Sequence, residues 1–176
     1  MPAQTGNMTA PTDAPGTRGW GLVGLGLLML LGAFYVFGAV SDLVSDAALG
    51  IPVDHVDTFG ALAGTGFHQL QASAPGTAGY ITVLERGYAL HELTFALLLL
   101  ALIAVPFRRR QRWAWWAAWL PMIANLGYTF TFGIHDPTIL YRSLIADIAL
   151  PVLLLAHLPA FFPVLERARA TSAGRA

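Results

Sequence analysis

The stretch ERGYALHELTFALLLLAL, residues 85–102, places an ionisable pair beside the most apolar part of the chain. From Phe95 to Phe107 the sequence is almost entirely hydrocarbon, whereas His91 and Glu92 lie just before that run. Such a run favours a helix in lipid, where a carboxylate at mid-bilayer costs about 2.5–3.5 kcal/mol. The position of Glu92 therefore predicts polar partners on neighbouring helices.

The composition of the whole chain agrees with a membrane location. Of its 176 residues, 56% are hydrophobic and 11% are charged, whereas soluble domains carry about 25% charged residues. This balance predicts an integral membrane protein. Ten basic and ten acidic residues cancel, so no nucleic-acid partner is expected. The chain has no cysteine, which excludes thiol catalysis, disulfides and cysteine-ligated metals.

Four apolar runs are each long enough to cross the hydrocarbon core, which needs about 20 helical residues. We therefore predict an all-α fold, an integral membrane four-helix transmembrane bundle over residues 18–166. Residues 1–17 are expected to be a disordered tail, and residues 167–176 a cytoplasmic tail. The outer loop 41–79 should be partly helical, because apolar residues recur at helical spacing from Val53 to Leu70. The predicted spans are residues 20–40, 87–107, 113–132 and 139–162.

The first apolar run also has features of a secretory signal peptide. The sequence GAVS before Asp42 would serve as a cleavage site. However, the run is longer than the usual signal-peptide core of about 7–15 residues. A retained first helix is therefore expected.

Arginine placement predicts the orientation of the bundle. Arg18, the segment 108–112 and the C-terminal arginines fall on one side if four helices span. The loop 41–79 contains no Arg or Lys. By the positive-inside rule, both termini are expected in the cytoplasm, with the protein in the bacterial inner membrane. Arg86 and Arg142 fall on the outer side, so each needs a partner there.

Three polar residues on different predicted helices lie at one depth. At 1.5 Å per residue, Glu92, Asn125 and Asp147 are each about 10 Å below the outer boundary. Turning them toward one another costs less than facing lipid, which predicts a polar pocket with Arg142 in reach of Asp147 or Glu85. Its expected lining is Tyr88, His91, Glu92, Asn125, Tyr128, Arg142 and Asp147. The alternative is a polar network that only fixes helix register.

Histidines on the outer side raise the question of a metal site. Imidazole and carboxylate groups bind Zn²⁺ or Cu²⁺. However, no pair has the compact spacing of a zinc helix, and DHVD and IHDP are equally ordinary cap or turn sequences. No metal is therefore expected, and no cofactor is indicated. The candidates, were a metal bound, are His55, His68, His91 and His135.

The chain resembles two membrane families. The stretch from Glu85 or Glu92 through FRRRQRWAWW is similar to small bacterial DoxX-like four-helix proteins. HELTF, RWAWWAAWLPMI and ADIALPVLLL resemble helices two to four of the EXPERA fold of sterol isomerases and sigma-2-type receptors. The second resemblance implies that Glu92 and Asp147 bind a cation or stabilise a carbocation. Asp42 would then be the counterpart of that family's acidic residue in helix one.

Three functions fit these features. The first is a small membrane protein that binds an apolar molecule or a lipid, alone, as a homo-oligomer or as a subunit of a larger complex. The second is a membrane enzyme with isomerase-like acid–base chemistry, for which Glu92 and Asp147 are the catalytic candidates. The third is a structural accessory subunit without a ligand. In each case the lipid bilayer is the expected surrounding partner.

Overall fold

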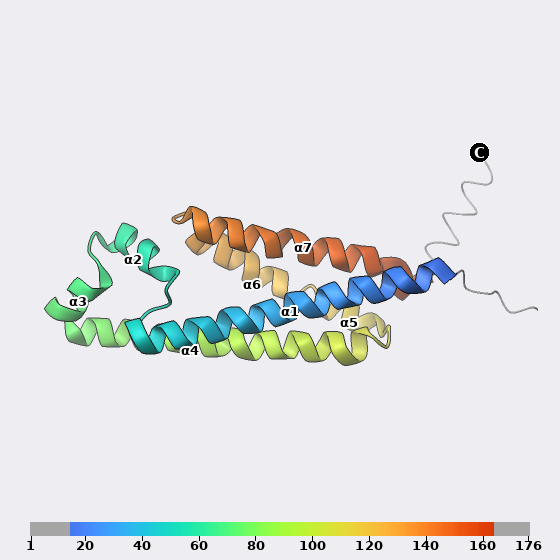
Figure 1. Ribbon diagram of the computed structural model, residues 1–176, viewed down its shortest axis with the longest axis horizontal. Helices are drawn as coiled ribbons and strands as arrows, with labels where there is room; N and C mark the ends of the chain where they lie inside the picture. Colours follow the sequence, from blue (N-terminus) through green and yellow to red (C-terminus); the bar gives the residue numbers. More distant parts are fainter. Residues whose placement is uncertain (1–14, 164–176) are drawn as a thin grey trace, which may run out of the picture.

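The structure is a computed structural model that describes residues 15–163, with side chains described from residue 21. Within that range the chain is helical and contains no strand. Figure 1 shows an elongated bundle with a small helical segment at one end, residues 50–74, which we call the cap. Its α-helices are α1 (Pro15–Leu49), α2 (His55–Ala63), α3 (Phe67–Ser73), α4 (Pro75–Leu102), α5 (Arg112–Ala117), α6 (Pro121–Tyr128) and α7 (Pro137–Phe161), with π-helical turns η1 (Ile103–Phe107) and η2 (Thr129–Gly133).

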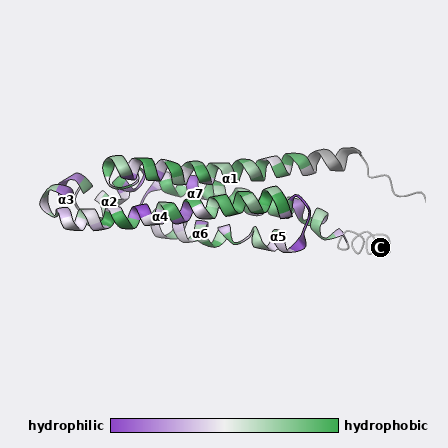
Figure 2. Ribbon diagram, turned by 90° about the horizontal axis from the view of Figure 1, so that it is seen from below, coloured by the Kyte–Doolittle hydropathy of each residue, from purple (hydrophilic) through white to green (hydrophobic). Residues whose placement is uncertain are grey.

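Within the described residues, three helices are long and apolar enough to cross a membrane. They cover Gly21–Leu49, Pro75–Phe107 and Pro137–Phe161. Large apolar side chains on their outer faces are exposed, as Leu22, Phe37 and Ile148 illustrate. In water such surfaces would be unfavourable, whereas in a bilayer they meet acyl chains. Figure 2 shows this apolar character along most of α1 and α4. These helices fit a lipid bilayer environment.

Two of the long helices extend beyond the apolar runs. No helix-breaking residue follows Val40, so α1 continues to Leu49 and ends where Gly50 adopts a φ of +87°. Pro75 begins α4 at the first helical position, where a missing N–H costs nothing. Asp42 and Asp46, predicted in the outer loop, therefore lie on α1. Most of residues 1–17 and all of 167–176, the two predicted tails, lie outside the described residues.

The third predicted run, residues 113–132, is not one continuous helix. It forms α5, a turn at residues 118–120, α6 and η2. The break coincides with Pro121, which has no N–H to continue the ladder of α5. Asp136 then caps α7, with its side chain accepting from the N–H of Thr138 at 2.7 Å. A bundle of four continuous membrane helices is therefore not seen within residues 15–163.

The apolar core is concentrated in the half of the bundle that holds the start of α1 and the end of α7, which we call the terminal end. Buried side chains there come from α1, α4, η1, α5 and α7: Leu28, Leu99, Ile103, Phe107, Trp115, Leu150, Leu154 and Phe161. Gly24 permits close approach, because a Cβ there would lie 2.5 Å from the His157 ring. A smaller cluster of Ile51, Phe67 and Ala78 holds the cap on α4. Figure 1 shows α1 and α7 diverging from the terminal end toward the cap.

Candidate functional site

A cavity of about 930 Å³ lies where α1 and α7 diverge. Its walls come from α1, α4, α6 and α7, and the segment before α2 contributes Val53 and Asp54. Ligand sites typically measure about 300–1,000 Å³ and are mostly apolar with a few polar groups. This cavity has both properties. The apolar wall includes Phe34, Phe37, Phe95, Leu98 and Ile145, and the polar wall includes Tyr35, Asp42, Tyr88, His91, Glu92, Asn125, Tyr128 and Arg142.

The structure brings most of the predicted site residues together. The cavity is lined by Tyr88, His91, Glu92, Asn125, Tyr128 and Arg142. Asp147 is absent from its lining. Its side chain is buried against η2, where Oδ2 accepts a 2.7 Å hydrogen bond from Thr129 Oγ1 and Oδ1 has no partner among the described residues. The rotation of α7 therefore turns Asp147 toward the π-helical turn.

Besides Glu92, the carboxyl groups of Asp42 and Asp54 line the cavity, and the sequence pattern placed both residues in the loop. Because α1 continues past Val40, Asp42 lies on α1, and both Asp42 and Glu92 line the cavity. Glu92 in turn lies over Gly38, where a Cβ would be 3.8 Å from Oε1. Two carboxylates that line the same cavity repel each other unless one is protonated or a cation is bound between them. Asp42 follows Tyr35 by about two helical turns, so a continued helix places both on one face, and this spacing could have predicted its position.

Asn125 connects the two sides of the cavity. Its Nδ2 donates a hydrogen bond to the hydroxyl of Tyr35, so α6 and α1 are joined across the end of the cavity nearest the apolar core. A side-chain amide in an apolar surrounding needs such a partner, because an unsatisfied polar group there costs several kcal/mol. The sequence pattern predicted Asn125 but not Tyr35, since tyrosines at membrane depth often only pack.

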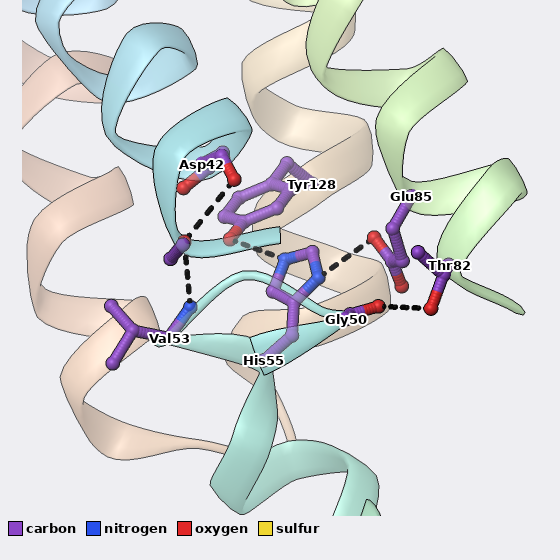
Figure 3. A network of polar contacts seen from close by, with 8 residues as sticks. Asp42, Gly50, Val53, His55, Thr82, Glu85 and Tyr128 are labelled. Carbon is purple, nitrogen blue, oxygen red and sulfur yellow. Dashed lines mark hydrogen bonds and ion pairs between the residues drawn. The ribbon is translucent and has the colours of Figure 1, made fainter. Parts of the chain in front are cut away.

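His55 lies at the cap end, where it contacts the cavity residue Tyr128, and Figure 3 shows its contacts. It is 2% exposed, and its Nδ1 lies 3.1 Å from Glu85 Oε2 while its Nε2 lies 3.1 Å from the Tyr128 hydroxyl. The ring stacks on Phe132 with centroids 4.7 Å apart. Burial alone would lower the pKa of His55. The hydrogen bond to Glu85 and the negative charges of Glu85, Asp54 and Asp42 outweigh burial and raise that pKa.

The four candidate metal histidines are not brought together. Both ring nitrogens of His55 have protein partners, as described above. His68 Nδ1 lies 2.9 Å from Gln71 Oε1, and His91 Nδ1 donates to the carbonyl of Gly87 at 2.7 Å. His135 is exposed beyond η2. Within residues 15–163, no group of three or more histidine or acidic side chains is placed to hold a metal ion.

The two arginines at the cap end both have acidic partners. Arg86 Nε donates to Asp46 Oδ2 at 3.0 Å, and Asp46 is fully buried. Arg142 Nη1 lies 4.0 Å from Asp54 Oδ2. The predicted contact of Arg142 with Asp147 or Glu85 is therefore wrong. The reason is that Asp147 faces Thr129, as already described, and that the segment before α2 carries Asp54 to Arg142 instead.

Hydrogen bonds between side chains and backbone groups fix residues 50–54, the segment that brings Val53 and Asp54 to the cavity wall. Thr82 Oγ1 donates to the Gly50 carbonyl at 2.6 Å, and Val53 N–H donates to Ser45 Oγ at 3.2 Å (Figure 3). Gln71 Nε2 also donates to the Leu49 carbonyl at 3.2 Å. The cap is therefore tied to both α1 and α4, and it holds Val53 at the cavity wall.

The sides of the cavity reach the surface of the bundle. On α4 the lining residues Thr94 and Leu98 are exposed, and on α6 Ala124 is exposed. On the opposite side Phe37 of α1 and Ile145 of α7 are exposed. An apolar molecule dissolved in lipid would therefore meet the cavity from the side without first crossing the cap.

Comparison with known proteins adds no relative to this description. No protein-family model, no curated protein and no solved structure matched the chain.

Proposed function

We propose that the chain crosses the membrane four times, with both termini in the cytoplasm and the cap outside. In this arrangement α5, α6 and η2 together form the third pass, with the break before Pro121 inside the protein. Broken helices are tolerated at membrane depth where protein covers the freed backbone groups. The supporting observation is charge: Arg108 to Arg112 lie at the end opposite the cap, and both cap-end arginines are paired with acids.

We further propose that the cavity binds one small, mainly apolar molecule or lipid taken up from the bilayer. The carrying observation is that two acids on neighbouring helices, Asp42 and Glu92, both line a mainly apolar cavity of about 930 Å³. Two carboxylates that line one cavity repel each other, and a ligand with a positive charge or a hydrogen-bond donor would relieve that repulsion. Phe34, Phe37 and Leu98 would then contact the apolar body of the ligand.

A catalytic role for Glu92 and Asp147 as an acid–base pair receives less support. Asp147 is held by Thr129 outside the cavity lining, so the two carboxyl groups do not face one bound molecule. If the site does chemistry, the geometry favours Asp42 as the second acid. Binding and turnover would then share the same two residues, and only product formation would distinguish them.

The test is the molecule that copurifies with the protein in mild detergent. Native mass spectrometry of the wild type should show a bound species, and Asp42→Asn and Glu92→Gln should each reduce its occupancy about tenfold or more. That loss is the size expected for one charge-assisted hydrogen bond in a dry site. Asp57→Asn is the matched control, because Asp57 is an exposed acid of α2 away from the cavity lining.

Folding must be followed in the same samples. Each variant should keep the thermal unfolding midpoint of the wild type within a few degrees. Equal occupancy in wild type, Asp42→Asn and Glu92→Gln would contradict the binding proposal and favour a purely structural role. A copurifying molecule that is converted on incubation would favour the enzyme instead.

A further inference from the structure

The basic residues of the described chain form two groups with different surroundings. Arg86 and Arg142 lie at the cap end, each beside an acid. The others with described side chains are at the opposite end: Arg108, Arg109, Arg110 and Arg112. Within residues 15–163, every Asp and Glu lies between residues 42 and 92 or between 136 and 147, in the cap half of the bundle. No ion pair joins the second group to an acid among these residues.

A compact turn presents these four side chains together. The N–H of Arg110 donates to the carbonyl of Phe107 at 2.8 Å, and the N–H of Gln111 donates to that of Pro106 at 3.0 Å. Arg110 adopts a φ of 56°, which reverses the chain between η1 and α5. All four arginines are exposed. We call residues 108–112 the arginine turn, and Figure 2 shows it as a hydrophilic patch beside α5.

The helix after the arginine turn carries exposed tryptophans on a fixed base. Trp113 is 58% exposed and Trp116 is 63% exposed. Between them Trp115 is buried, and its Nε1 donates to the Leu154 carbonyl at 2.8 Å, which anchors α5 to α7. Arg112 lies 5.6 Å from the centre of the Phe162 ring. Indole rings prefer the headgroup level of a bilayer, which would place α5 at the level of the lipid phosphates.

From this juxtaposition we infer that the arginine turn is a binding site for the phosphate of an anionic phospholipid, with Trp113 and Trp116 against its acyl and glycerol region. Guanidinium groups bind phosphate oxygens through two parallel hydrogen bonds, and four of them within five residues neutralise a headgroup of negative charge. Zwitterionic lipids offer the same phosphate but no net charge. The site therefore selects lipids by charge, and it is separate from the cavity at the cap end.

The test uses the tryptophans of the protein itself. Four of the five tryptophans in the chain lie between residues 113 and 119, beside the arginine turn. Purified protein in neutral detergent is titrated with brominated phosphatidylglycerol, which quenches indole fluorescence on contact, and in parallel with brominated phosphatidylcholine of the same chains. Phosphatidylglycerol should quench at about tenfold or more lower concentration. High salt should remove the difference, because surface charge is screened.

The triple variant Arg108→Gln, Arg109→Gln, Arg110→Gln should remove the preference. Each arginine at an anionic surface strengthens binding about fivefold, so the loss of three lowers the affinity for phosphatidylglycerol by up to roughly 100-fold. The matching Arg→Lys triple variant keeps the charge, so it should retain most of the preference, and it guards against failure to fold. Arg86→Gln is the control, because Arg86 lies at the cap end and does not line the cavity, and the folded variant should behave as wild type.

Three outcomes would overturn the inference. The first is equal quenching by the two lipids in the wild type. The second is an unchanged preference in a folded Arg→Gln triple variant. The third is full competition by inorganic phosphate at the concentration of the lipid, which would indicate a site for a free anion. Loss of the cavity ligand in Glu92→Gln has no bearing on this result, so the two proposals fail independently.

Discussion

At the scale of single residues, His55 connects more parts of the molecule than any other side chain of the site. It begins α2, and its two ring nitrogens meet Glu85 on α4 and Tyr128 on α6. Ring stacking on Phe132 adds η2 to these contacts. His55, which is almost completely buried, therefore adds contacts with α4, α6 and η2 to the other bonds that hold the cap.

Replacing His55 should loosen the cap. His55→Ala leaves Glu85 and Tyr128 without their partner, and hydrogen bonds to charged groups contribute about 1.5–3 kcal/mol each. We expect the free energy of unfolding in detergent to fall by about 2–4 kcal/mol. Denaturant titration followed by circular dichroism measures this fall. His68→Ala, on exposed α3, should change it by less than about 0.5 kcal/mol.

The same residue gives the protein a pH dependence with a defined sign. Because the folded-state pKa of His55 is raised above its ordinary value of 6.5, protonation favours the folded state. The stabilisation is complete below pH 6.5 and is lost as pH rises through the raised folded pKa. Unfolding midpoints from pH 5.5 to pH 9 should therefore decline in the wild type more steeply than in His55→Gln. Parallel curves, or a wild type that gains stability over this range relative to the variant, would contradict the assignment.

At the scale of elements, α1 and α7 are in close contact at the terminal end. Gly24 faces the ring of His157, whose Nδ1 donates to the Leu153 carbonyl at 2.7 Å. The ring is buried between the helices and cannot swing away without losing that bond. Gly26, two residues along, has no atom within 4 Å of the position where a Cβ would lie. Alanine variants of Gly24 and Gly26 are therefore a matched test and control for this contact.

Gly24→Ala should destabilise the bundle, whereas Gly26→Ala should not. The added methyl at residue 24 would overlap the His157 ring, and overpacking typically costs about 1–3 kcal/mol. At residue 26 the methyl meets open space on the outer face of α1, and the expected change is within about 0.5 kcal/mol. Unfolding of both variants in the same denaturant measures the difference. Equal stability of the two would mean that α1 and α7 are not in close contact at this point.

The sequence predicted the long helices well because their signal is hydrophobic length. Three of the four predicted runs correspond to helices able to span a membrane. The run at residues 113–132 was misjudged because its hydropathy is continuous while its backbone breaks at Pro121. The apolar pattern placed Asp42 in the outer loop, and only the resemblance to the EXPERA fold assigned it to the first helix. Acids were taken as loop residues, although nothing after Val40 stops the helix.

Partners across the cavity were harder to predict than helices. Depth along a helix follows from counting residues, and Glu92 and Asn125, which were expected at one depth, do line the same cavity. Rotation about the helix axis does not follow from counting, because the hydrophobic pattern of a membrane helix is nearly uniform around it. Asp147 was therefore expected at the cavity, whereas α7 turns it toward Thr129.

At the scale of the whole molecule, the apolar core and the cavity occupy different halves of the bundle. The apolar core lies at the terminal end, and the cavity lies at the cap end between walls that diverge. Substitutions in the cavity wall should therefore affect binding without unfolding the bundle. Ala124 on α6 is a suitable position, because it lines the cavity and is exposed.

Ala124→Phe should place a ring in the cavity and reduce occupancy by the copurifying molecule about tenfold or more. A phenyl group fills part of the volume that the proposed ligand needs, and the free energy of unfolding should stay within about 0.5 kcal/mol. Ala101→Phe on α4 is the control, since Ala101 is exposed but does not line the cavity. Native mass spectrometry compares the two. Unchanged occupancy in Ala124→Phe would indicate that the copurifying molecule sits elsewhere.

The divergence of α1 and α7 has a mechanical consequence. Their contact at Gly24 and His157 fixes the spacing of the two helices at one end, and the pair of Arg142 with Asp54 links α7 to the segment after α1 at the other end. In a bilayer, lateral pressure in the acyl region would press the diverging parts together, while thinner or more loosely packed lipid would relieve that pressure. If the cavity binds a ligand as proposed, its affinity should then depend on the elastic state of the surrounding bilayer.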